Sequence, residues 1–333
     1  MDEQKENSTS LTGMAITEEQ IGFEKHQLAV CSSCGKPNGP DRRDCIYCGR
    51  SLPRTEHNAD VRNWNLRPLE DWETAFNVVI IASENAAANL SSIVDRLGIE
   101  HSVIADLVEK RTPLPLVRIE SRETADEVSA LLRENEIETR AIHDREIDAA
   151  NLPTRIRAIE LDEDFVRFVD FNTGKERRAD LSDIVLVVSG GISESRREEV
   201  TRRKRGSTKI LDEHESGSDH RLIDIYTDKD NIGFRLSTHG FDFSILGEKK
   251  DLFAVKNIAT LQTFFSQLFS NAVIADEYDS VRGQLDRVWE PSSTKNSNGL
   301  QMHRYGKREF GATYVSNNLV QFTKYSRMRR LLI

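Results

Sequence analysis

The sequence contains no long hydrophobic run. In a chain of 333 residues, the longest apolar stretch is Ile184–Val188, whereas a helix that spans a membrane needs about 20 consecutive apolar residues. The mean hydropathy is −0.53, and the first 25 residues lack the charged segment and apolar core of an export signal. We therefore expect a cytoplasmic protein with no membrane partner.

Motifs that mark common catalytic sites are also missing. The sequence has no GxSxG nucleophile turn, no GxxxxGK[ST] phosphate loop and no GxGxxG dinucleotide turn. Gly190-Gly191 is too short for a phosphate loop and predicts a bulge or a turn. The eight histidines are scattered. We therefore expect no enzyme, and an unfamiliar catalytic site in the β-rich part would show itself as a deep pocket with convergent acids or histidines.

Cysteine is scarce, and all four residues lie close together in the sequence: Cys31, Cys34, Cys45 and Cys48. They form two CxxC pairs, each followed by a glycine that lets the backbone curl around the sulfurs. Two disulfides are disfavoured in a reducing compartment, and a redox CxxC does not explain the second pair. The spacing predicts one tetrahedral Zn²⁺ bound by four thiolates.

Such a zinc ion has no open coordination position, so its expected role is structural. This segment, residues 26–54, resembles the short zinc ribbons of many bacterial proteins. Residues 31–54 contain five Lys or Arg against two Asp, and the −2 charge of a zinc with four thiolates leaves the ribbon near +1. That weak charge favours docking to a protein over binding to nucleic acid.

The next segment, residues 73–148, predicts three short strands and three helices in βααβαβ order, a compact α+β sandwich. Phe76-Asn-Val-Val-Ile80, Ala105–Glu109 with Pro113–Leu116, and Ser121–Glu127 resemble the C-terminal domain of the bacterial ribosomal stalk protein. That fold is also similar to the protease adaptors that read destabilising N-terminal residues. The residues that bind partners in those families have no counterpart here, so the resemblance implies the fold alone.

From residue 153 to 290 the hydrophobic period becomes two, which predicts two hairpins, residues 155–171 and 222–236. Two amphipathic helices follow the strands. The order of elements resembles pleckstrin-homology-like domains, with a bent β-sheet plugged by a helix. Residues 189–220 interrupt the pattern with the basic run Arg196–Arg205 and the acidic stretch Asp212–Glu215. We expect a solvated hairpin whose opposite charges neutralise each other; the alternative is an arm that binds a partner or nucleic acid.

The remaining segments are polar. Residues 1–25 are predicted to be disordered, residues 55–72 to form a linker, and residues 291–333 to form a second linker and a basic tail. The tail contains eight Lys or Arg against one Glu, a net charge of +7 that leaves −16 on the rest of the chain. It either binds an anionic partner, with aromatic residues such as Tyr305 and Phe322 stacking on bases, or docks on its own acidic body with Leu319–Phe322 as an added strand. Gln321–Arg327 also resembles the tails of uncharacterised bacterial zinc-ribbon proteins.

Together these features predict a multidomain α+β protein that acts as a non-catalytic, zinc-binding interaction or regulatory scaffold. We expect its partner to be a protein. The alternative is nucleic-acid binding through the ribbon, Arg196–Arg205 and the basic tail, and no small-molecule ligand is indicated.

Overall fold

The computed structural model describes residues 28–39, 42, 45–50, 52, 64, 66, 69–70, 72–83, 90–204, 207–304 and 307–333. The chain divides into two compact units, Met1–Trp64 and Asn65–Ile333. The predicted disordered N-terminus and most of the predicted 55–72 linker lie outside the described residues. In the part of the chain that the structure describes, no helix is long and apolar enough to cross a membrane.

The first unit contains a two-stranded antiparallel sheet. Strand β1, Ala29–Val30, pairs with β2, Pro37–Asn38. The first CxxC pair lies in the connection between β1 and β2, so Cys31 follows β1 directly and Cys34 lies three residues further along.

The second unit begins with the predicted α+β module. Its three-stranded antiparallel sheet has the order β4-β3-β5, and three helices pack with it, as the hydrophobic pattern predicts. Asn77 in the central strand is fully buried, and its side-chain amide donates to Asp144 Oδ1 at 2.8 Å. The elements are β3 (Phe76–Ser83), α1 (Leu90–Leu97), α2 (His101–Glu109), β4 (Leu114–Ile119), α3 (Arg122–Glu134) and β5 (Ile137–His143).

A large curled β-sheet follows, with the strand order β13-β14-β9-β10-β11-β6-β7-β8 and β12 paired to β9. Its last two strands are β13 (Ser292–Arg304) and β14 (Lys307–Asn317). The two predicted hairpins are present as β6–β7 and β10–β11. The elements are β6 (Thr154–Leu161), β7 (Phe165–Asp170), β8 (Glu176–Asp180), η3 (Leu181–Asp183), β9 (Ile184–Lys204), β10 (Ser207–Thr227), β11 (Phe234–Ser237), η4 (Phe243–Lys249), α4 (Ala254–Leu268), β12 (Val273–Ala275) and α5 (Tyr278–Leu285).

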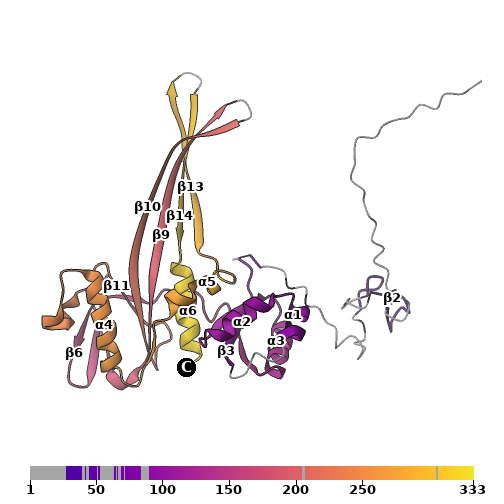
Figure 1. Cartoon of the computed structure of the whole chain (residues 1–333), viewed down its shortest axis with the longest axis horizontal. Coiled ribbons are helices and arrows are strands. Elements are labelled where there is room, and N and C mark those ends of the chain that lie inside the picture. The colour runs from indigo at the N-terminus through magenta and orange to yellow at the C-terminus, as the bar shows by residue number, and fades with distance from the viewer. Residues whose placement is uncertain are drawn as a thin grey trace, which may run out of the picture. The chain divides into compact units, whose positions relative to one another are not determined.

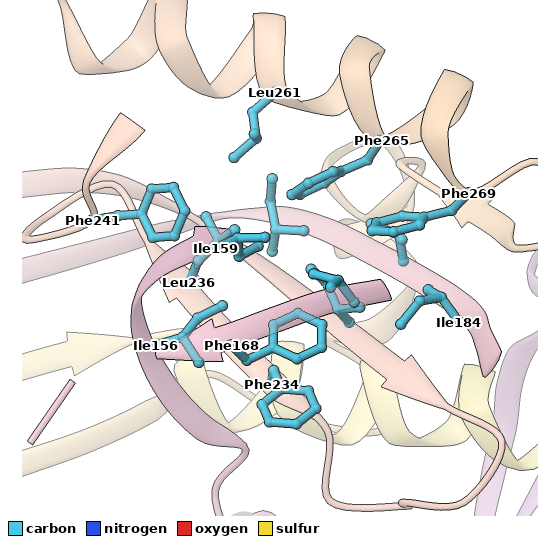
Figure 2. Close-up of a cluster of buried hydrophobic side chains, with 14 of the residues drawn as sticks. Ile156, Ile159, Phe168, Ile184, Phe234, Leu236, Phe241, Leu261, Phe265 and Phe269 are labelled. Carbon is cyan, nitrogen blue, oxygen red and sulfur yellow. The ribbon is translucent and has the colours of Figure 1, made fainter. Parts of the chain in front are cut away.

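One apolar core joins the curled sheet to helix α4. Leu261, Phe265 and Phe269 point from α4 and its C-terminal end toward the sheet, as Figure 2 shows. Beneath them Phe168 and Phe234 stack with ring centroids 4.0 Å apart. The broad apolar face that the sequence predicts for this helix therefore closes the concave side of the sheet, because both surfaces are removed from water together.

The predicted excursion at residues 189–220 is a hairpin arm. Strands β9 and β10 continue beyond the core and pair from Ile184–Thr227 to Lys204–Ser207, with register shifts between Tyr226 and Thr227 and between Ile210 and Asp212. On its other edge β9 pairs first with β12 and then with β14. The arm is therefore a four-stranded sheet, β13-β14-β9-β10, that extends away from the core of this unit (Figure 1).

The predicted linker at residues 291–333 is wrong, and the basic tail packs on its own unit, which is one of the two alternatives that the sequence left open. This segment forms the hairpin of β13 (Ser292–Arg304) and β14 (Lys307–Asn317), followed by helix α6 (Leu319–Leu331). Leu319–Phe322, predicted as a strand, is the first turn of α6, which lies against β9 and α5. Phe322 and Tyr325 are buried there and are not available for stacking on bases.

Helix α6 buries Phe322, Tyr325 and Met328 and is also held by buried polar contacts. Tyr226 Oη lies 2.9 Å from Ser326 Oγ, and Tyr278 Oη donates to Gln321 Oε1 at 2.8 Å. Gln321 donates in turn to the carbonyl of Trp289 at 2.8 Å. Burial of these polar groups is tolerated because each has a hydrogen-bond partner.

The prediction of a bulge or a turn at Gly190-Gly191 is also wrong. Both glycines lie inside β9, in unbroken register with Leu222 and Arg221. A Cβ on Gly190 would lie 2.5 Å from Tyr278 and 2.7 Å from Phe322. The missing side chain allows α5 and α6 to pack directly on the strand.

Candidate functional site

The four cysteines form one cluster in the first unit. All four sulfur atoms lie within 4.8 Å of one another, and all four cysteines are free thiols. The Cys31–Cys48 and Cys34–Cys45 sulfurs are 3.6 and 3.5 Å apart. Four sulfurs placed tetrahedrally at about 2.3 Å from one ion would be separated by roughly 3.8 Å, so the cluster fits a metal ion.

Each CxxC pair folds into the same tight turn. Gly35 and Gly49 adopt φ of 69° and 70°, a conformation that favours glycine. Their N–H groups donate at 2.8 Å to the carbonyls of Cys31 and Cys45. The glycine that follows each pair in the sequence is thus required by backbone geometry, and the two turns present their sulfurs in equivalent ways.

Asn38 connects the two turns, and sequence reasoning missed it. Its side chain is buried; it donates to the carbonyl of Lys36 at 2.9 Å and to Cys45 Sγ at 3.5 Å. Its Oδ1 accepts the N–H of Ile46 at 2.9 Å. An asparagine seven residues before the second pair carries no signal of this role, because only the fold brings it to the sulfur.

Hydrogen bonds, burial and neighbouring sulfurs give the thiols of Cys34 and Cys45 different pKa values. Burial raises the pKa of Cys45, but the N–H groups of Tyr47 and Cys48 and the amide of Asn38 outweigh it and lower the pKa to about 6. The N–H of Lys36 lowers the pKa of Cys34, yet burial and the three other sulfurs raise it to about 12. A divalent cation at the centre would offset this repulsion and allow all four thiols to ionise.

A second candidate site lies at the foot of the arm. A pocket of about 600 Å³ lies between β9, β10, α4 and α5. Its lining includes acidic, basic and imidazole side chains: Asp219, His220, Arg221, His239, Asp279 and Arg282. A pocket with convergent acids and histidines is the expected mark of a catalytic or small-molecule site.

Two of the charged groups in this pocket, Arg221 and Asp279, bind each other. Arg221 Nη1 lies 2.8 Å from Asp279 Oδ2, and the other oxygen of Asp279 accepts the N–H of Gly191 at 2.7 Å. The rings of His220 and His239 meet edge to face with centroids 5.6 Å apart. Burial, with His239 beside it, lowers the pKa of His220. Within the described residues these two rings are not part of a three-ligand metal cluster.

The predicted basic segments come together in the arm. The run from Arg196 lies on β9, and the basic residues from Lys295 to Arg308 lie on β13 and β14. In the part of the run nearer the core, basic side chains are paired with acidic ones, as expected: Arg197 Nη1 lies 3.5 Å from Glu213 Oε1. The same guanidinium lies over the ring of Tyr314. Arg205 and Tyr305 lie outside the described residues.

No protein-family model matches this chain, no curated protein matches it, and no solved structure matches it.

Proposed function

We propose that the chain is a non-catalytic interaction protein, in which a structural zinc ion folds the ribbon and the β-arm contacts a partner. The observation that carries this proposal is the arm. A four-stranded sheet in a single layer buries little apolar surface, and all of β10 from Ile210 to Asp219 is exposed. A sheet that lacks a covering layer contributes little to the core of its own unit, and it offers two open faces and two edge strands to another molecule.

The four-sulfur cluster supports a structural ion. Thiolate ligands in a tetrahedral set are typical of zinc, and four of them leave no position for water or substrate. The few apolar residues of the ribbon cannot form a core, so metal binding supplies its folding free energy, roughly 10–16 kcal/mol for comparable zinc-binding peptides. Because every cysteine is committed to this cluster, none is available as a nucleophile.

Shortening the arm tests this proposal. Residues 201–211 and 300–310 are each replaced by Asn-Gly, which closes the hairpins after the Val200–Asp212 and Gly299–Gly311 pairs. We expect the shortened protein to keep one zinc ion per chain and its thermal midpoint, and to lose the macromolecule that co-purifies with the full chain. If the full chain associates with no macromolecule, or if the shortened chain keeps the same one, the arm is not the interaction device.

The pocket at the foot of the arm supports a second candidate function, the binding or conversion of a small molecule. His220 and His239 are the groups that would carry it, because Arg221 and Asp279 already bind each other. A thermal-shift screen of small carboxylates and phosphates tests it. A compound that stabilises the wild type but not His220→Ala would support this function, and the absence of any such compound would count against it.

A further inference from the structure

The strand segments at the distal end of the arm are rich in lysine and arginine. We infer that this end binds the phosphate backbone of a nucleic acid; this inference rests on the proposed function of the arm and names its partner.

The strand register brings together two segments that are about a hundred residues apart in the sequence. In β9 and β10, Arg202 pairs with Lys209 and Lys204 with Ser207. In β13 and β14, Arg304 pairs with Lys307. Strands β9 and β14 are joined up to the pair Arg202–Glu309, so both hairpins end at the same end of the arm (Figure 1).

The charges of the arm are strongly polarised along its length. The described distal residues, 201–204, 207–210, 300–304 and 307–310, contain seven Lys or Arg against one Glu, a net charge of +6. The nearer part, residues 193–200, 211–219 and 292–299, contains three Lys or Arg against seven Asp or Glu, a net charge of −4. The acidic stretch that neutralises Arg197 therefore lies in the nearer part of the arm and does not extend to the distal end.

The length of the arm matters because charges act over a limited range. From Ser193 to Lys204 the strand spans about 36 Å, at roughly 3.3 Å per residue. At physiological salt, electrostatic interactions in water are screened over about 8 Å. The acidic residues at the foot of the arm, Asp219 and Asp279 among them, therefore do not cancel the field of the distal end.

The shape of the distal end also suits a nucleic acid. Beyond the Arg202–Glu309 pair the two hairpins diverge, and each continues as a two-stranded ribbon (Figure 1). A two-stranded ribbon is an element that the major groove of B-DNA admits. At the base of these ribbons, Ile210 and Phe310 both oppose Thr201, and they are 52% and 41% exposed. They offer apolar contact to sugars and bases beside the basic residues.

Binding of labelled nucleic acid to the full chain tests the inference. The probes are a short DNA duplex, the RNA duplex of the same sequence and the single strand, each titrated between about 50 and 200 mM salt. The test variant carries Arg202→Gln, Arg203→Gln and Lys204→Gln. The matched control carries Arg196→Gln, Arg197→Gln and Lys295→Gln, which removes the same charge from the nearer part of the arm.

We expect the wild type to bind at least one probe with an affinity that falls steeply with salt. The distal variant should bind about 30-fold or more weakly at the low end of the salt range, and its salt slope should fall by up to about 2.7, since each phosphate contact contributes roughly 0.9. The control should change less than threefold. The ranking of the three probes identifies the form of nucleic acid.

Equal losses in both variants, or no binding of any probe by the wild type, would overturn the inference. Circular dichroism and zinc content confirm that both variants are folded. If the full chain still forms complexes that depend on the arm but resist nuclease, the proposed function stands and the nucleic-acid partner is wrong.

Discussion

Trp289 donates its indole N–H to Asn77 Oδ1 at 2.9 Å, across 212 residues of sequence. Both side chains are buried, and Asn77 also donates to Asp144 Oδ1 at 2.8 Å. This contact fastens the small α+β module to the end of α5 and hence to the curled sheet. The module resembles independent domains in its sequence. Here, however, the side-chain oxygen of Asn77 in its central strand receives its hydrogen bond from Trp289, far along the chain.

Replacing this tryptophan should therefore weaken the attachment of the module. We expect Trp289→Phe to lower the free energy of unfolding by about 1–3 kcal/mol, because Asn77 Oδ1 loses its donor in a buried site. Urea denaturation measures the change. Trp72→Phe, at a position that is 80% exposed, is the control and should have almost no effect. Equal midpoints for Trp289→Phe and the wild type would contradict the role of this hydrogen bond.

The buried ion pair beneath α6 gives a second prediction. Arg235 Nε and Nη2 contact the two oxygens of Asp224 at 2.6 and 2.7 Å, and Nη1 donates to Thr323 Oγ1 at 3.0 Å. Arg235→Met should lower the free energy of unfolding by about 3–5 kcal/mol, because the charge of Asp224 is left buried without a partner. Adding Asp224→Leu should recover much of the loss. A double variant as unstable as Arg235→Met alone would show that packing, not charge, dominates.

Gly190 supplies a test of the packing of α5 and α6 on β9. Gly190→Ala should lower the free energy of unfolding by about 1–3 kcal/mol, since its Cβ would lie 2.5 Å from a ring carbon of Tyr278. Gly217→Ala, in the paired strand, is the matched control, because its Cβ would lie 3.5 Å from the carbonyl oxygen of Glu194, an ordinary contact distance. Chemical denaturation of both variants measures the difference, and similar losses would argue against a steric cause.

The ribbon offers a test of Asn38. Asn38→Ala should lower the affinity for zinc by about 10- to 100-fold, because the amide that holds Cys45 Sγ and the Ile46 N–H is lost. Competition with a chromophoric chelator measures the affinity. Ser33→Ala, at an exposed position in the first turn, is the control. An unchanged affinity in Asn38→Ala would mean that the two turns are joined by the metal alone.

The pH dependence of stability follows from His220. Burial and the neighbouring His239 lower its pKa in the folded state, so between that value and about 6.5 the unfolded chain binds more protons. This contribution to stability is present above about pH 6.5 and is lost as the pH falls through the folded pKa. NMR titration of the imidazole measures its pKa directly, and His239→Gln should raise it. A pKa for His220 that is unchanged in this variant would exclude an electrostatic effect of His239.

The local elements of this protein could be predicted from the sequence because short-range chemistry defines them. Two CxxC pairs with their glycines predict the sulfur cluster, and only a tight turn can use that spacing. The alternating and three-to-four residue patterns predict the α+β module, the two hairpins and the apolar face of α4, because each pattern reports which side of one element leaves water.

The tertiary structure alone decided where distant segments meet. Nothing in the sequence shows that β14 pairs with β9, since strand pairing depends on backbone hydrogen bonds that every residue can make. That pairing turns two separate basic segments into one arm end. The sequence also left open whether the tail is exposed or docked. Helix α6 is buried because Phe322, Tyr325 and Met328 pack in the core and because Tyr226, Tyr278 and Trp289 supply hydrogen-bond partners from elsewhere in the chain.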